Sequence, residues 1–300
     1  MDGIINIYKE PGFTSHDVVA KLRGILHQKK IGHTGTLDPD AAGVLPVCCG
    51  KATKVCGLLS DRDKSYHAVC QLGIETDTQD ISGSIIRECR INSITADDII
   101  NCVKKFKGNI MQVPPMYSAL KVNGKKLYEL AREGKTVERK PRQVNILSIE
   151  VSDINLSNGT FGLDVTCSKG TYIRTLCHDI GISLGTAAAM ANLVRTRVSV
   201  FKIEDAVTLG EVQYMSDNNP EKLKEYFMPA DALFTGYKKV QIKSSFAGSL
   251  ANGNKLSGNM FYSEAPEPQD GENILVYNEN GVFKAIYQRE AGEYKVNKMF

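Results

Sequence analysis

The chain has 300 residues, of which 42% are hydrophobic, so it is long enough for one large domain or two moderate ones with a buried core. Its formal net charge of +3 does not by itself indicate nucleic-acid binding, and no stretch reaches the roughly 18 apolar residues of a membrane helix. The eight cysteines include no Cys-x-x-Cys pair and no zinc or haem spacing, and the N-terminus lacks the pattern of a secretion signal, so we expect a cytoplasmic protein with reduced thiols.

The first part of the chain predicts two strands and two helices that open with capping boxes. Residues 3–8 alternate like a short strand, and residues 64–73 form a second candidate strand. In Thr14–Asp17 and again in Thr95–Asp98, a threonine precedes an aspartate by three residues, and apolar residues follow at helical spacing. A further short helix is expected around residues 55–59.

The second half predicts two helices, over residues 124–133 and 171–185, on either side of a pair of strands over residues 143–152 and 160–168. The polar stretch 216–221 is expected to be a loop near the end of the first domain. From Tyr237 onward, short apolar runs alternate with Gly and Asn, which indicates a small β-rich domain (candidate strands 240–242, 274–277 and 283–287). Runs of strands with separate helices favour an α+β fold over a doubly wound sheet.

Residues 32–46 form the most constrained segment, because they hold three glycines, two prolines and two carboxylates between apolar residues. This composition argues against a long helix or an ordinary central strand. Asp38 precedes Pro39, which pushes its backbone toward an extended geometry. A carboxylate on such a loop can act as nucleophile, base or electrostatic stabiliser, but an Asp-Pro pair also commonly shapes a turn. Both interpretations stay open at this point.

Four other residues are candidates for the same chemistry, and each has a structural alternative. Arg174 near the start of its helix is the natural counter-charge for Asp38, or it belongs to an ordinary ion pair. Tyr66 offers a face for stacking a base, or it is a core residue. His33 is a proton shuttle or a hydrogen bonder within the loop, and Lys9 touches a phosphate or braces the loop.

Residues 121–142 concentrate positive charge, because they carry eight basic and three acidic side chains, a net charge of +5 (Lys121, Lys125, Lys126, Arg132, Lys135, Arg139, Lys140 and Arg142 against Glu129, Glu133 and Glu138). We call this the basic segment. Such a patch suits a phosphate backbone, and the alternative is a solvated helix face. No Walker loop, His-Glu-x-x-His or Gly-x-Gly-x-x-Gly motif is present, so no cofactor or metal is expected.

Four segments in order resemble the TruB family of tRNA pseudouridine synthases. They are residues 5–17 with Lys-Glu-Pro-Gly, residues 32–46 with Gly-His-Thr-Gly-Thr-Leu-Asp-Pro, residues 64–78 with Lys-Ser-Tyr, and residues 168–176 with Gly-Thr-Tyr-Ile-Arg. The resemblance covers residues 4 to about 200. It implies an α+β catalytic domain over residues 1–234 with a mixed, largely antiparallel sheet, and a PUA-like RNA-binding domain over residues 235–300.

The resemblance also implies an activity and a substrate. The chain would isomerise uridine to pseudouridine at the position conventionally numbered 55 in the T loop of tRNA, after flipping the base out. It would act as a monomer without a guide RNA, a cofactor or a metal. The alternatives are a tRNA-folding chaperone with secondary catalysis and an RNA-binding module without catalysis.

Carried over position by position, the resemblance makes Asp38 the catalytic aspartate. Tyr66, Arg174, Tyr172 and Leu193 would form the pocket for the target base. The RNA contacts would come from other positions (His33, Lys9, Lys125, Lys126, Arg139 and Lys140).

Overall fold

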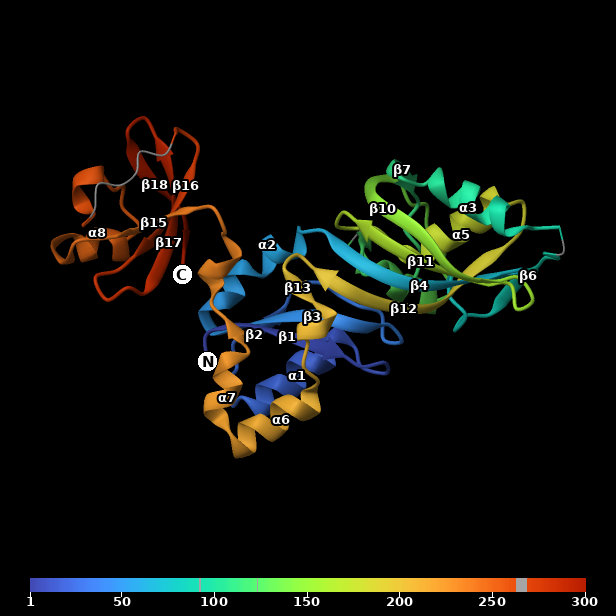
Figure 1. Cartoon of the computed structure of the whole chain (residues 1–300), viewed down its shortest axis with the longest axis horizontal. Helices are drawn as coiled ribbons and strands as arrows, with labels where there is room; N and C mark the ends of the chain where they lie inside the picture. Colours follow the sequence, from blue (N-terminus) through green and yellow to red (C-terminus); the bar gives the residue numbers. More distant parts are fainter. Residues whose placement is uncertain (92, 123, 263–268) are drawn as a thin grey trace.

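The computed structural model describes residues 1–91, 93–122, 124–262 and 269–300. A ten-stranded mixed sheet has the order β14-β1-β3-β12-β4-β11-β10-β7, with β2 paired to β3 and β13 paired to β12 (Figure 1). Only the β3–β12 pair in this sheet is parallel among the described pairings. The expected α+β fold with a largely antiparallel mixed sheet is therefore confirmed. Its strands are β1 (Gly3–Lys9), β2 (Ile31–His33), β3 (Ala42–Cys49), β4 (Lys64–Leu72), β7 (Gly108–Gln112), β10 (Arg142–Asn155), β11 (Thr160–Cys167), β12 (Ala188–Val198), β13 (Phe201–Lys202) and β14 (Phe227–Met228).

Helices cover this sheet in two groups (Figure 1). The first group packs on β1 and β3 and consists of α1 (Ser15–Ile25), α6 (Leu209–Asn218) and α7 (Pro220–Glu225). The second packs on β4, β10 and β11 and consists of α3 (Ala96–Lys104) and α5 (Ile173–Ser183). Both predicted capping boxes form, at Thr14 and Thr95. The short elements are η1 (Gly50–Val55), α2 (Cys56–Ser60), α4 (Leu127–Arg132), η2 (Ile203–Asp205), η3 (Ala230–Leu233), and two hairpins, β5 (Ile74–Thr76) with β6 (Ile85–Glu88) and β8 (Lys121–Val122) with β9 (Lys125–Lys126).

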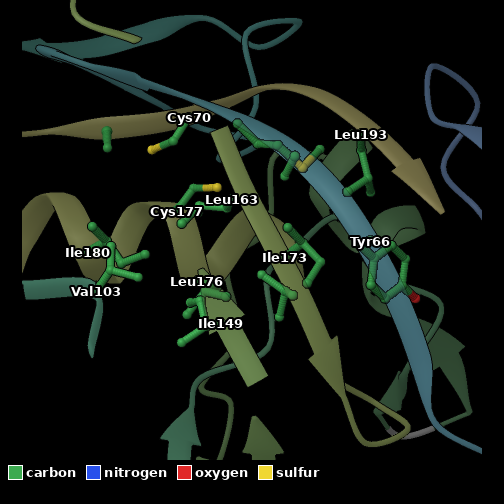
Figure 2. Packing of buried hydrophobic residues seen from close by; sticks show 14 of the residues in the cluster. Tyr66, Cys70, Val103, Ile149, Leu163, Ile173, Leu176, Cys177, Ile180 and Leu193 are labelled. Carbon is green, nitrogen blue, oxygen red and sulfur yellow. The ribbon is translucent and has the colours of Figure 1, made fainter. Parts of the chain in front are cut away.

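The core between α5 and the sheet reaches the region where the candidate site lies. Alternate residues of β4 are buried, beginning with Lys64 and Tyr66. Figure 2 shows Tyr66 and Leu193 at one end of this core and Cys70, Cys177 and Ile180 at the other. Tyr66 is therefore a core residue that lies at the edge of the core nearest to the candidate site.

The C-terminal residues build a second, four-stranded sheet with its own core. Its order is β15-β16-β17-β18, and Val240, Ile274 and Tyr287 are buried within it. A further apolar cluster joins Leu275 and Ile286 of this sheet to residues of β1, β3, η1 and α2. The elements are β15 (Lys238–Gln241), η4 (Ser244–Phe246), α8 (Ala247–Ala251), η5 (Gly258–Met260), β16 (Asn273–Tyr277), β17 (Phe283–Glu290) and β18 (Glu293–Met299).

The expectation that residues 32–46 contain no ordinary central strand is wrong for β3. Every residue of β3 is buried, and the strand lies between β1 on one side and β2 and β12 on the other. The Pro46 carbonyl accepts from the Thr34 backbone N–H at 3.2 Å, so the backbone of Pro46 faces the chain just beyond the end of β2. Pro46 is tolerated because the N–H that it lacks would point to the same place, where the β2–β3 pairing has already ended.

The loop expected at residues 216–221 is also wrong, because α6 and α7 cover most of this stretch. The signals for these helices are the capping box of Thr208 with Glu211, and Asn219 followed by Pro220 at the first helical position. Only Asn219 interrupts the helical structure. Among the described residues, no helix is long and apolar enough to cross a membrane.

A substitution at Gly43 tests the packing of β3 against β12. Gly43 has φ of 106°, and a Cβ built on it would lie 2.9 Å from the Arg195 backbone nitrogen and closer still to the Arg195 carbonyl oxygen. We expect Gly43→Ala to lower the free energy of unfolding by about 3 kcal/mol in urea denaturation. Gly24→Ala in α1 is the control, because a Cβ there meets nothing within 4 Å, and it should be neutral or slightly stabilising. Equal stability of the two variants would contradict this description of the β3–β12 contact.

Candidate active site

A pocket of about 260 Å³ lies where β4, β12, the start of α5 and the loop between β2 and β3 meet. It gathers all five residues that the sequence predicted for the catalytic group and the base pocket (Asp38, Tyr66, Tyr172, Arg174 and Leu193). Its wall also contains groups that were not predicted, among them Lys64, Ser118 and Arg195. Residues more than 130 positions apart in the sequence therefore converge on one cavity.

The loop over residues 34–41, which we call the Asp38 loop, is tied to α1 and β1 through its backbone. The Leu37 N–H donates to the hydroxyl of buried Ser15 at 2.9 Å. The Pro39 carbonyl accepts from the Gly12 N–H at 3.0 Å and from the Lys9 ammonium at 2.9 Å. These contacts hold the segments on both sides of Asp38, so its side chain projects from a fixed backbone.

Lys9 is fully buried, and the expectation that it contacts RNA is wrong. Its ammonium also donates to the carbonyls of Phe13, at 2.7 Å, and Glu10, at 3.2 Å, so all three of its N–H groups serve the protein backbone. Burial lowers the pKa of Lys9 to about 8, partly offset by Asp40 and Asp38. Lys9 therefore braces the Asp38 loop, which is the other alternative that the sequence left open.

Asp38 and Arg174 form a two-point ion pair. The Arg174 Nε lies 3.0 Å from Oδ2 of Asp38, and Nη2 donates to Oδ1 at 3.3 Å. The Arg174 side chain is 6% exposed, while that of Asp38 is 41% exposed toward the pocket. A paired fork of this kind fixes the orientation of the carboxylate as well as its position.

The remaining donors of Arg174 are also occupied, which locks the guanidinium. Nη1 donates to the Thr78 carbonyl at 3.0 Å and lies 3.5 Å from Oδ2 of Asp80, and Nη2 donates to the Tyr117 carbonyl at 2.8 Å. Asp80 is a residue of this network that the sequence analysis missed. No local pattern marks it, because Asp80 meets Arg174 only when α5 packs beside the segment that follows β5.

The helix start that carries Arg174 is clamped by a buried amide. Gln112, at the end of β7, accepts from the Tyr172 N–H at 3.0 Å and donates to the Tyr172 carbonyl at 3.2 Å. Tyr172 itself has no side-chain capping bond. This clamp positions the first turn of α5, and with it Arg174, against the Asp38 loop.

Burial raises the pKa of Asp38 above its ordinary value, the Arg174 guanidinium opposes this rise, and the Asp80 carboxylate adds to it. Burial also raises the pKa of Tyr66 and that of Tyr172. Both phenols thus stay neutral over the ordinary pH range. The pocket combines the fixed carboxylate of Asp38 with three tyrosines, Tyr66, Tyr117 and Tyr172, and the apolar side chain of Leu193, which suits a planar base attached to a sugar.

The predicted RNA-contact residues lie in different environments. Lys125 and Lys140 are exposed. Lys126 donates to the Tyr128 hydroxyl at 3.0 Å, and Arg139 donates to the Pro114 carbonyl at 3.2 Å, so both are partly engaged by the protein. His33 is half-buried: its Nδ1 accepts from the Gly35 N–H at 3.3 Å, and burial lowers the pKa of its imidazole.

Comparison with known proteins assigns the chain to a family. Residues 23–173 match the model of the TruB family pseudouridylate synthase N-terminal domain, and residues 174–235 match that of the tRNA pseudouridylate synthase B C-terminal domain. The chain belongs to the TruB family. Similar TruB relatives include the tRNA pseudouridine synthase B of Lachnoclostridium phytofermentans, 48% identical over all of both chains, and that of Clostridium perfringens strain SM101, 44% identical over 100% of this chain and 99% of that one.

Solved structures show the same fold. A chain from the crystal structure of a Cbf5–Nop10–Gar1 complex superposes with a TM-score of 0.72 at 29% identity, covering 99% of this TruB chain and 84% of that chain. A chain from the structure of an H/ACA RNP bound to a substrate RNA containing 2′-deoxyuridine also gives a TM-score of 0.72, at 28% identity and with the same coverage. The pseudouridine synthase fold predicted from the four sequence motifs is thus confirmed.

A second charged cluster fastens α5 to the strand β5. His178 lies one turn after Arg174, with Nε2 3.1 Å from Oε1 of Glu75 and Nδ1 3.3 Å from Oδ1 of Asp179. Glu75 also pairs with Arg87 at 2.7 Å. The contact with Asp179 and then that with Glu75 raise the pKa of His178 above its ordinary value, while partial burial opposes them.

We expect this cluster to make stability depend on pH. Because the pKa of His178 is higher in the folded state, its contribution is complete below the unfolded pKa of about 6.5 and is lost as pH rises through the folded pKa. In urea denaturation, His178→Gln should lower the free energy of unfolding by on the order of 1 kcal/mol at pH 5.5, and by less at pH 8.5. A difference between wild type and variant that stays constant between these pH values would contradict the prediction.

Proposed function

We propose that this chain converts uridine to pseudouridine in the T loop of tRNA, with Asp38 as the group that acts on the ribose. The observation that carries the proposal is the Asp38 carboxylate, held at two points by Arg174 and facing a pocket with Tyr66 on its wall. Membership of the TruB family supports the reaction class, and the relatives' printed name, tRNA pseudouridine synthase B, supports tRNA as the substrate.

The first step is extrusion of the target nucleotide, which costs a few kcal/mol of lost stacking. Stacking of the uracil on Tyr66 returns about 1–3 kcal/mol of this cost. The pocket volume of about 260 Å³ leaves room for a single base with part of its ribose. Leu193 and Tyr172 then bound the space in which the base is retained.

The chemical step exchanges a C–N glycosidic bond for a C–C bond. In the nucleophilic route, an Asp38 oxygen bonds to C1′ while N1 leaves with the bonding pair; the detached uracil then turns, and C5 attacks C1′ and displaces the carboxylate. In the elimination route, the carboxylate instead takes the proton from C2′ while N1 leaves with the bonding pair, which gives a glycal; C5 of the turned uracil then bonds to C1′ as that proton returns to C2′. In both routes C5 loses a proton and N1 gains one, so the product is an isomer of the substrate and no redox change is needed.

Arg174 serves both routes in the same way, because it keeps Asp38 ionised and aimed at the pocket. The buried surroundings strengthen this interaction and limit the access of water to a reactive intermediate. Asp80 acts through Arg174, since its carboxylate lies on the far side of the guanidinium from Asp38 and shares its charge.

The tRNA is proposed to lie across the basic segment, with His33 near the flipped nucleotide. Lys125 and Lys140 offer exposed charges for phosphates. We further propose that the chain works as a monomer without a guide RNA. Residues 1–234 would form the catalytic domain and residues 235–300 a PUA-like RNA-binding domain, which is supported by the separate core of the C-terminal sheet.

Replacement of Asp38 tests its assigned role. We expect Asp38→Asn to reduce the single-turnover rate of pseudouridine formation by at least about 10⁴-fold, because the amide can neither attack C1′ nor accept a proton. Binding of tRNA should change by less than about threefold, since the substitution removes only one contact of a large interface. Asp40→Asn is the matched control, because Asp40 is an exposed carboxylate two residues away, and it should keep near-normal activity. An active Asp38→Asn protein would overturn the assignment.

The basic segment is tested through the salt dependence of binding. Replacing Lys125 and Lys140 together by Gln should reduce the slope of log K against log[salt] by about 1.5, because each lost phosphate contact removes roughly 0.7–0.9. The control replaces Lys222 and Lys224 on α7 by Gln, which are also exposed but precede β14, at the opposite edge of the large sheet from β7 and β10, which flank the basic segment. An unchanged slope in the Lys125 and Lys140 variant would mean that the basic segment is a solvated surface that does not contact phosphates.

A further inference from the structure

Arg195 is a buried cation in the pocket wall that the mechanism above does not use. It lies on β12, opposite Tyr66 of β4 on one side and opposite Gly43 of β3 on the other. The residue is 1% exposed, and it belongs to the wall of the same pocket as Asp38. It therefore stands between the strand that carries the stacking ring and the strand that follows the Asp38 loop.

The guanidinium of Arg195 ties the N-terminal part of the Asp38 loop to β3, the strand that follows the loop. Nη2 donates to the Gly35 carbonyl at 3.2 Å and Nη1 to the Thr36 carbonyl at 3.3 Å, both on the N-terminal side of Asp38. Nε donates to the Val44 carbonyl at 2.8 Å on the C-terminal side. One side chain thus closes the loop from which the catalytic carboxylate projects.

No carboxylate of the described residues lies within 4 Å of this cation. Its other neighbour is Tyr66, which lies opposite Arg195 in the register of β4 and β12, and whose phenol raises the pKa of the guanidinium against the lowering effect of burial. Burying an unpaired charge is costly, and an apolar residue would fill the same space without that cost. The three carbonyls that accept from Arg195, together with the neighbouring Tyr66, indicate that the buried charge holds these groups in place.

We propose that Arg195 is a positioning residue that fixes the Asp38 carboxylate relative to the Tyr66 ring, and so acts on the chemical step and not on tRNA binding. This inference rests on the proposed function, because it assigns the reacting ends of the pocket to Asp38 and Tyr66. Arg195 itself touches only the protein. Its effect reaches the substrate through the loop backbone and the tyrosine ring.

The size of the effect follows from the geometry that the reaction needs. A displacement of about 1 Å between a catalytic group and its reacting atom costs on the order of 10²-fold in rate. Lysine keeps the charge but cannot reach three carbonyls in a planar fork, so it should restore only part of the positioning. We therefore expect single-turnover rates that fall about 100-fold in Arg195→Gln and about 10-fold in Arg195→Lys.

The experiment measures single-turnover formation of pseudouridine in unmodified tRNA, together with the Kd of the same tRNA. The matched control is Arg197→Gln on the same strand. Arg197 bonds the Ser65 hydroxyl at 3.1 Å and the Ser199 carbonyl at 2.9 Å, and it does not line the pocket. We expect Kd to stay within about threefold of wild type in all three variants, and the rate of Arg197→Gln to stay near wild type.

A double-mutant cycle separates positioning from general structural support. Because Arg195 positions the Tyr66 ring, Tyr66→Phe should cost less in the Arg195→Lys background than in wild type. If thermal melting shows that Arg195→Gln does not fold, the rate, the Kd and the double-mutant cycle measured with Arg195→Lys decide the inference. Additive losses, rates within about threefold of wild type, or a rate loss matched by an equal rise in Kd would each overturn the inference. A folded wild-type protein that forms no pseudouridine would instead overturn the proposed function.

Discussion

The ion pair between Asp38 and Arg174 is the constraint on which the site depends. It joins a loop near the N-terminus to a helix that begins 135 residues later, and both must be fixed before the pair can form. The loop is fixed by Ser15 and Lys9. The helix is fixed by the Gln112 clamp at Tyr172. Each support is a buried polar group bound to main-chain atoms, which gives a rigid geometry, and the charged one among them, Lys9, does not line the pocket.

The large sheet brings the supported segments together at one site. Its parallel contact between β3 and β12 places Arg195 beside Gly43, and the adjacent β4 places Tyr66 on the same wall. The close approach of the two backbones at Gly43 explains why the segment after Asp38 needs a residue without a side chain. The glycine that suggested an irregular loop in fact permits a central strand.

The sequence sufficed for the parts of the site that are encoded locally. Asp38 before Pro39, Tyr66 on an alternating strand and Arg174 at a helix start could all be predicted, because each lies in a short motif. Asp80, Gln112 and Arg195 could not, because their roles depend on which elements meet in the sheet. The error at β3 has the same origin, since the missing N–H of Pro46 matters only if a neighbouring strand continues beside it. The role of Lys9 could not be predicted either, because a lysine in such a motif is compatible both with a phosphate contact and with a buried structural contact. Only its burial in the structure distinguishes the two.

The measurement that most directly tests this account is the mapping of pseudouridine, nucleotide by nucleotide, in an unmodified tRNA transcript incubated with the purified protein. We expect one new pseudouridine, in the T loop. A transcript that stays unmodified with folded protein, or one modified only outside the T loop, would contradict it.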